Sequence, residues 1–135
     1  MSKAARDLIQ RYYAAFNAHH DEGMLRLLSE DVVHDLNQGG RETGRAAFRV
    51  FLTRMARCYR EQLTDLVIMS DAAGTRAACE YVVQGTYLVA DAGLPPAHGQ
   101  RYVLPGGAFF ALREGVIARV TNYYDLPAWL AQVRS

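Results

Sequence analysis

The chain has 135 residues, half of them apolar, and a formal net charge of only +1 at pH 7. A chain of this length and composition can bury one core, so we expect a single domain over residues 1–135. The fifteen basic residues are spread singly along the chain. Because nucleic-acid binding requires clustered cations that face phosphates, we expect no nucleic-acid partner.

Cysteine spacing, metal-ligand spacing and hydrophobic runs exclude further classes. Cys58 and Cys79 show no Cys-x-x-Cys or Cys/His spacing, so we expect two buried, reduced thiols. No His, Asp or Glu pair has the i, i+4 spacing of helical metal ligands on a pocket face, and no phosphate loop is present, so we expect neither a metal nor another cofactor. With no run of 18 apolar residues and no signal peptide, we expect a cytoplasmic protein without membrane contact.

Three helices are predicted in the N-terminal half. Over residues 3–18 the apolar side chains recur every three or four positions, which is the stripe of an amphipathic helix. A shorter helix starts at Asp21 and ends at Ser29-Glu30-Asp31. A strand over residues 32–36 then leads to the Gly39-Gly40 turn, and residues 44–60 repeat the helical spacing.

From residue 62 the apolar period changes from 3.6 to 2, which indicates strands. Four strands are predicted, over residues 62–70, 75–89, 100–113 and 116–124. This order indicates an α+β fold, in which a cone-shaped, curved antiparallel sheet packs against three N-terminal helices. Gly85 and Pro105-Gly106-Gly107 lie inside strands and should let the sheet curl around a pocket. The loop over residues 90–99 is either a lid on that pocket or a plain hairpin connection.

Two adjacent residues at the end of the first strand can carry acid–base chemistry. A carboxylate at Asp35 that faced an apolar pocket would have a raised pKa and could move a proton between carbons next to a carbonyl. Neighbouring strand residues point to opposite faces, so His34 and Leu36 face the pocket if Asp35 does not. His34 is then the candidate base, since its ordinary pKa of about 6.5 suits that task.

The last strand adds candidates at the other end of the chain. Asn122 and Tyr124 share a face with Ala118 and Val120, which we expect to point inward. Asp125 follows directly, and it either caps the final helix or turns inward. The expected ligand-binding wall comprises Phe16, Phe51, Phe109, Asn122 and Tyr124, together with Tyr12.

These segments resemble a known family. Arg11-Tyr12, Asn17-Ala18, Asp21-x-Gly23, Leu27-Leu28-x-x-Asp31 and an acid at the end of the next strand are similar to the opening of ketosteroid isomerases and SnoaL-like polyketide cyclases. Both belong to the nuclear transport factor 2-like (NTF2-like) superfamily. The resemblance extends to residues 120–126 and to Trp129-Leu130-Ala131-Gln132-Val133.

The resemblance implies a fold and residue roles. It implies an NTF2-like barrel in which Tyr12 donates a hydrogen bond to a developing enolate oxygen, while Tyr13 points about 100° away around the helix. Matching Tyr12 without gaps puts the isomerase base at Leu36, one residue after Asp35. Asp125 corresponds to the acid/base residue of the cyclases. The second isomerase acid should lie in residues 100–113, where no acid occurs, which counts against steroid isomerisation.

The predicted function is therefore cofactor-independent proton transfer, of isomerase or cyclase type, on a small hydrophobic carbonyl compound. We expect a homodimer formed through the outer face of the sheet. One alternative is a non-catalytic small-molecule binding module with the same pocket. Another is an epoxide hydrolase, which would need an Asp-Arg-Asp set that Arg119, opposite Asn122, is poorly placed to complete.

Overall fold

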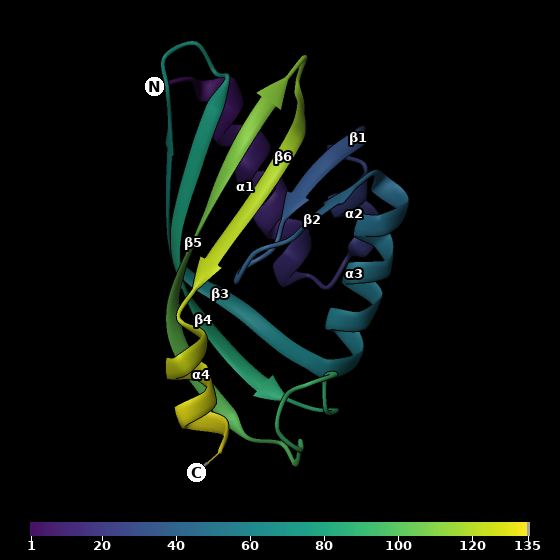
Figure 1. The fold of residues 1–135 in the computed structure, drawn as a ribbon. Helices are drawn as coiled ribbons and strands as arrows, with labels where there is room; N and C mark the ends of the chain where they lie inside the picture. Colours follow the sequence, from purple (N-terminus) through teal and green to yellow (C-terminus); the bar gives the residue numbers. More distant parts are fainter. Residues whose placement is uncertain (135) are drawn as a thin grey trace.

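The computed structural model describes residues 1–134, which form four helices and one six-stranded sheet (Figure 1). The helices are α1 (Lys3–Asn17), α2 (Asp21–Leu25), α3 (Arg45–Cys58) and α4 (Leu126–Val133). The strands are β1 (Leu28–Asp35), β2 (Arg41–Thr43), β3 (Tyr59–Ser70), β4 (Arg76–Tyr87), β5 (Arg101–Arg113) and β6 (Val116–Tyr124). The predicted α+β class is confirmed. None of the described helices is long and apolar enough to cross a membrane.

The sheet has the strand order β2-β1-β6-β5-β4-β3. Strands β3 to β6 form the predicted antiparallel series, but β1 pairs with β6 in parallel, which the sequence analysis did not foresee. A register shift in β3 between Thr64 and Val67 is the kind of bulge that bends a strand. The sheet curves around α1, and α3 lies beyond its β1–β2 edge (Figure 1).

Several element boundaries differ from those predicted, and one strand was not predicted. Ser29-Glu30-Asp31 belongs to β1 and not to a helix end, because Leu28 already pairs with Ile117 of β6. Helix α3 ends at Cys58, since Tyr59 and Arg60 pair with β4 as the start of β3. Strand β2 was not predicted, because three residues are too short to show a period.

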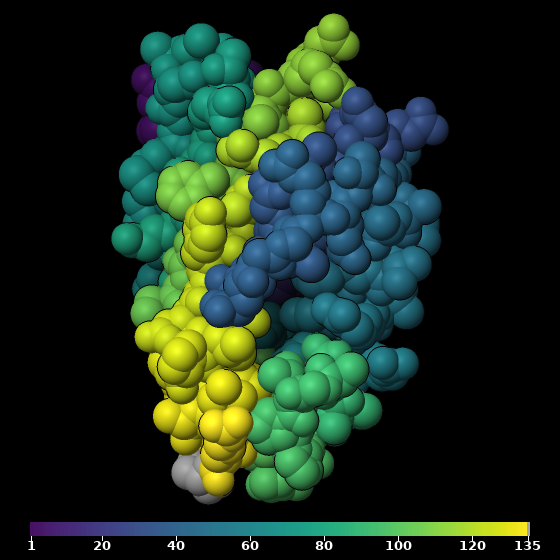
Figure 2. Space-filling model, in the orientation of Figure 1, coloured from purple at the N-terminus to yellow at the C-terminus, as the bar shows by residue number. Residues whose placement is uncertain are grey.

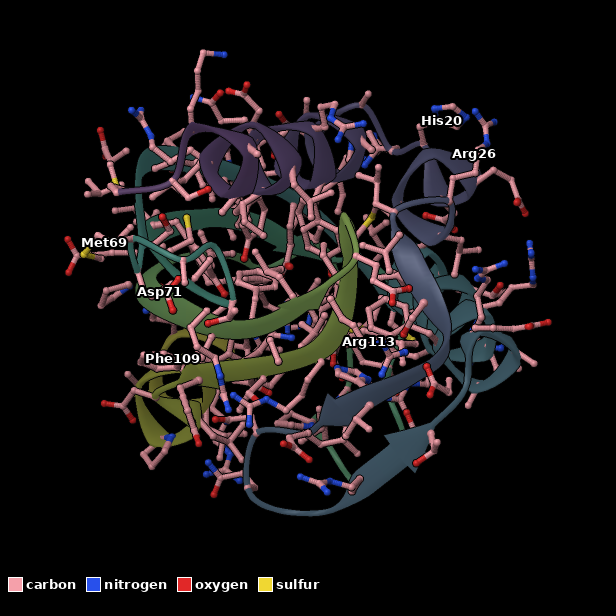
Figure 3. All side chains as sticks on the ribbon, turned by 90° about the horizontal axis from the view of Figure 1, so that it is seen from above. His20, Arg26, Met69, Asp71, Phe109 and Arg113 are labelled. Atoms are coloured by element: carbon pink, nitrogen blue, oxygen red, sulfur yellow. The ribbon has the colours of Figure 1, made fainter. Side chains whose placement is uncertain are left out.

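Alternation along β5 decides which side chains enter the core. Tyr102, Leu104, Ala108 and Phe110 are buried, whereas Phe109 is 50% exposed. Phe109 lies on the opposite side of the sheet from α1, as Figure 3 shows. The expectation that Phe109 lines the pocket is corrected: Phe110 takes the inward position, because adjacent strand residues face opposite ways. Cys58 and Cys79 are buried free thiols, as predicted.

Gly106 lets an aromatic ring lie flat on the inner face of β5. It pairs with Tyr81 of β4, and a Cβ atom at position 106 would lie only 2.6 Å from Cε1 of the Tyr81 ring. Adjacent Gly107 faces the other way, and a Cβ there would meet only the Cys79 carbonyl oxygen at an ordinary 3.5 Å. Two neighbouring glycines therefore carry different constraints.

We expect Gly106→Ala to lower the free energy of unfolding by about 1–3 kcal/mol, because the added methyl displaces the buried Tyr81 ring. Gly107→Ala is the matched control and should change it by less than about 1 kcal/mol. Urea denaturation of both variants measures the difference. Equal losses would contradict the role given to the Tyr81 ring.

Candidate active site

The inner face of the sheet, helices α1, α3 and α4, and the loop after β4 enclose a cavity of about 450 Å³. The surface is hollowed where the β1–β2 connection, the C-terminal segment and that loop meet (Figure 2). Six of the eight tyrosines line the cavity: Tyr12, Tyr13, Tyr59, Tyr81, Tyr102 and Tyr124. Aromatic and aliphatic side chains predominate over polar ones in the wall, which suits a small, largely hydrophobic molecule.

His34 is a polar residue in the wall of this cavity. It pairs with buried Val120 of β6, and only 2% of it is exposed. The rings of Phe48 and Phe51 lie 4.8 and 4.5 Å from the imidazole, and Nδ1 is 3.6 Å from Oε1 of Glu42. Burial lowers the pKa of His34, an effect that the Glu42 carboxylate partly offsets. The imidazole is therefore neutral at pH 7.

Asp35 lies on the other face of β1 and does not line the cavity. Arg41 donates to both carboxyl oxygens, at 2.6 and 3.1 Å, and the Thr121 hydroxyl donates to Oδ2 at 3.2 Å. The Arg41 guanidinium holds the pKa of Asp35 below its ordinary value, the opposite of what a general base needs near pH 7. The parallel register with β6 thus selects the alternative in which His34 and Leu36 face the cavity.

Tyr12 and Tyr13 both line the cavity from the buried face of α1. Their rings meet edge to face, with centroids 5.1 Å apart. Burial raises the pKa of both phenols, so each stays a neutral hydrogen-bond donor. The Tyr13 hydroxyl is fully buried and has no hydrogen-bond partner among residues 1–134. Both tyrosines therefore contribute to the wall, although the sequence analysis assigned the donor role to Tyr12.

Four of the expected ligand-binding residues line the cavity: Phe16, Phe51, Asn122 and Tyr124. Asp125 does not. Its Oδ1 accepts a hydrogen bond from the Ala128 amide at 3.1 Å, and the residue is exposed as the N-cap of α4. Of the two alternatives, Asp125 therefore takes the capping position. Its carboxylate faces the N-terminus of α4 and not the cavity.

Glu61 is a cavity residue that the sequence analysis missed. It lies on β3 between Tyr59 and Leu63, which also line the cavity, and its Oε2 accepts a hydrogen bond from the Tyr102 hydroxyl at 2.5 Å. Burial raises the pKa of Glu61. The prediction began this strand at residue 62. Extending the alternation of Leu63 back by two residues would have placed Glu61 inside.

The loop between β4 and β5 forms one wall of the cavity through Asp91, Ala92 and Leu94. Asp91 accepts a hydrogen bond from the Tyr59 hydroxyl at 2.8 Å and lies 3.7 Å from Nε of Arg54. The Tyr87 hydroxyl accepts from the Asp91 amide and donates to the Pro95 carbonyl. These hydrogen bonds attach the loop to β3 and β4. The loop therefore covers one side of the cavity in either predicted role, as a lid or as a plain hairpin connection.

No metal cluster is assembled in the described part of the chain, and Arg119 is not the centre of an epoxide-hydrolase triad. Residues 1–134 contain no group of three His, Cys, Asp or Glu side chains that could hold a metal ion. Arg119 does not line the cavity, so it cannot form the centre of an Asp-Arg-Asp set there.

Comparison with solved structures gives close matches over the whole chain. A proposed polyketide cyclase from Pseudomonas putida KT2440 is 57% identical, with a TM-score of 0.95 and coverage of 96% of this chain and 97% of that one. One from Xanthomonas campestris pv. campestris is 59% identical, with a TM-score of 0.94 and 97% coverage of both chains. One from Silicibacter sp. TM1040 is 50% identical, with a TM-score of 0.96 and coverage of 98% and 97%.

No curated protein matches the chain. The profile of the SnoaL-like domain matches residues 9–120, which include β1, most of α1 and most of the cavity wall. The chain belongs to the SnoaL-like domain family.

Proposed function

We propose that the protein catalyses cofactor-independent proton transfer next to the carbonyl group of a small hydrophobic compound, as an isomerase or cyclase. The observation that carries the proposal is the His34 imidazole, which is neutral, buried and set in the wall of an aromatic cavity. The similar proteins described as proposed polyketide cyclases support a substrate with a carbonyl group.

In this mechanism His34 is the general base. It removes a proton from the carbon beside the carbonyl. The electron pair of that C–H bond forms a C=C bond, and the π pair of the C=O bond moves onto the oxygen. Tyr12 donates a hydrogen bond to the oxygen as negative charge develops there. The imidazolium of His34 then returns the proton to another carbon. In a cyclase the enolate carbon attacks a second carbonyl group of the substrate, whose C=O π bond breaks, and the imidazolium protonates the resulting alkoxide oxygen. The Phe48 and Phe51 rings keep water from the imidazole and fix its orientation.

We expect His34→Gln to slow this proton transfer about 10²- to 10⁴-fold, the usual contribution of a general base. The measurement is hydrogen–deuterium exchange at the carbon beside the carbonyl, followed by NMR in D₂O with bicyclic β,γ-unsaturated ketones and aryl β-diketones. Asp35→Asn is the matched control, since the neighbouring side chain lies outside the cavity, and it should exchange within about threefold of the unmodified chain.

Two outcomes of this assay would contradict the proposal. If Asp35→Asn lost exchange and His34→Gln kept it, the base would lie on the face of β1 opposite to the one that carries His34. If the unmodified chain bound these ketones and exchanged none of them, the protein would be a binding module with the same cavity.

We expect the exchange rate to fall at low pH, below the pKa of His34, which burial sets under the ordinary value of about 6.5. Glu42→Gln should move this acid limb to still lower pH, because the Glu42 carboxylate raises that pKa. The folded pKa lies below the unfolded one, so His34 also costs stability as pH falls from about 6.5 to the folded pKa. The pH dependence of the exchange rate measures the position of the acid limb, and NMR titration of His34 measures its pKa, in the unmodified chain and in Glu42→Gln. A limb moved upward by Glu42→Gln would contradict the assignment.

We also propose that two copies associate through the outer face of the sheet. Val103, Phe109 and Tyr123 are 53%, 50% and 55% exposed there, and the rings of the last two meet at 5.9 Å. Sedimentation should give twice the chain mass of 15.1 kDa, and Tyr123→Arg should give a single chain because it places a charge in the apolar contact. A single-chain mass for the unmodified protein would contradict this.

A further inference from the structure

We propose that Glu61 is a neutral hydrogen-bond donor and forms a subsite for an anionic ligand oxygen, such as that of an enolate or phenolate. Tyr102, whose ring lies over Gly85, holds the Glu61 carboxyl group in position. This proposal deepens the function proposed above and rests on it for its role in the reaction. The subsite itself stands on the geometry of three neighbouring strands.

The three residues lie in one row across the sheet. Glu61 of β3 pairs with Gly85 of β4, and Gly85 pairs with Tyr102 of β5. The Tyr102 ring crosses above Gly85 and brings its hydroxyl to Oε2 of Glu61 at 2.5 Å. A Cβ atom at position 85 would lie closer to the ring than any real Cβ contact. The missing side chain at Gly85 is therefore what lets Tyr102 reach Glu61.

The surroundings of Glu61 favour its uncharged form. No described arginine, lysine or histidine forms an ion pair with it, whereas Asp91 lies against Arg54 and Asp35 against Arg41. Tyr81 and Tyr102 flank it in the cavity wall. Burial raises the pKa of Glu61 more than the Tyr102 hydrogen bond lowers it. Burial without an ion-paired cation favours the protonated form of a carboxyl group.

The position of that proton follows from the hydrogen bond. Tyr102 donates to Oε2, so the proton of the neutral acid lies on Oε1. Oε1–H can then donate to a ligand oxygen in the cavity. When a base removes the proton beside a carbonyl, the electron pair moves to that oxygen, and Oε1–H stabilises the charge or transfers its proton to give the enol. In the second case the Glu61 carboxylate regains the proton when the enol returns to the ketone.

The test uses 2,4-dinitrophenolate as a probe, because it is an anion throughout pH 5.5–8. The chain's single tryptophan, Trp129, lines the cavity, so its fluorescence reports binding without any assay of activity. At pH 6 we expect Glu61→Gln, which can still donate, to change Kd by less than about threefold. Glu61→Ala, which cannot donate, should weaken binding at least tenfold, because it loses a hydrogen bond to a charged oxygen.

Gly85→Ala tests the positioning role, with Gly107→Ala as the control on the neighbouring strand. Gly85→Ala should weaken binding of the probe about as much as Glu61→Ala, and Tyr102→Phe should weaken it by a smaller factor. Gly107→Ala should bind as the unmodified chain does. Circular dichroism and thermal unfolding at the binding temperature establish that each variant is folded before its Kd is compared.

Two results would overturn the subsite. One is probe binding at least tenfold tighter in Glu61→Gln than in the unmodified chain at pH 6, since relief of charge repulsion would mean that Glu61 is ionised. The other is unchanged binding in Glu61→Ala. Failure of the proposed reaction would give a different result. The unmodified chain and its variants would show the expected order of Kd values for the probe, but the unmodified chain would exchange no carbon-bound proton.

Discussion

The parallel pairing of β1 with β6 is the contact on which the site depends. It sets His34 beside Val120 and Asp35 beside Thr121, and neighbouring strand residues face opposite ways. As a result the imidazole enters the cavity, while the carboxylate stays outside, bound to Arg41 and Thr121. A slip of one residue would bury the ion-paired acid and expose the histidine. The hydrogen bonds of one strand pair thus decide which group has access to a ligand.

Inside the cavity, burial acts in opposite directions on the two titratable groups that matter most. It lowers the pKa of His34 and raises that of Glu61, so burial favours the neutral form of each group. One neutral group can accept a proton and the other can donate one. Aromatic and aliphatic side chains make up most of the remaining wall, which strengthens both interactions by excluding water. Two glycines allow the tyrosine rings to form part of this wall. The Tyr102 ring lies over Gly85 of β4 and the Tyr81 ring lies over Gly106 of β5, and a side chain at either position would displace the ring.

The fold could be predicted from the sequence because the apolar periods of α1, α3 and the long strands are strong, and because the ends of the chain resemble a family. The site could be predicted only in part. His34 and Asp35 were recognised as a pair, but the choice between them depends on a parallel register that no local pattern encodes. Phe109 was preferred to Phe110 although alternation from buried Tyr102 selects the latter. Glu61 was missed because the Arg-rich end of α3 obscured where the helix stops and β3 begins.

The central claim, that His34 is the base, is tested most directly by chemical rescue. In His34→Ala the lost imidazole leaves a space between Phe48 and Phe51 that opens to the cavity. Added imidazole should restore exchange of the carbon-bound proton with saturation, and 4-methylimidazole and other substituted imidazoles should do so in the order of their basicity. If His34→Ala lost no activity, or if Asp35→Ala were the variant that a small external base such as acetate restored, the account would be contradicted.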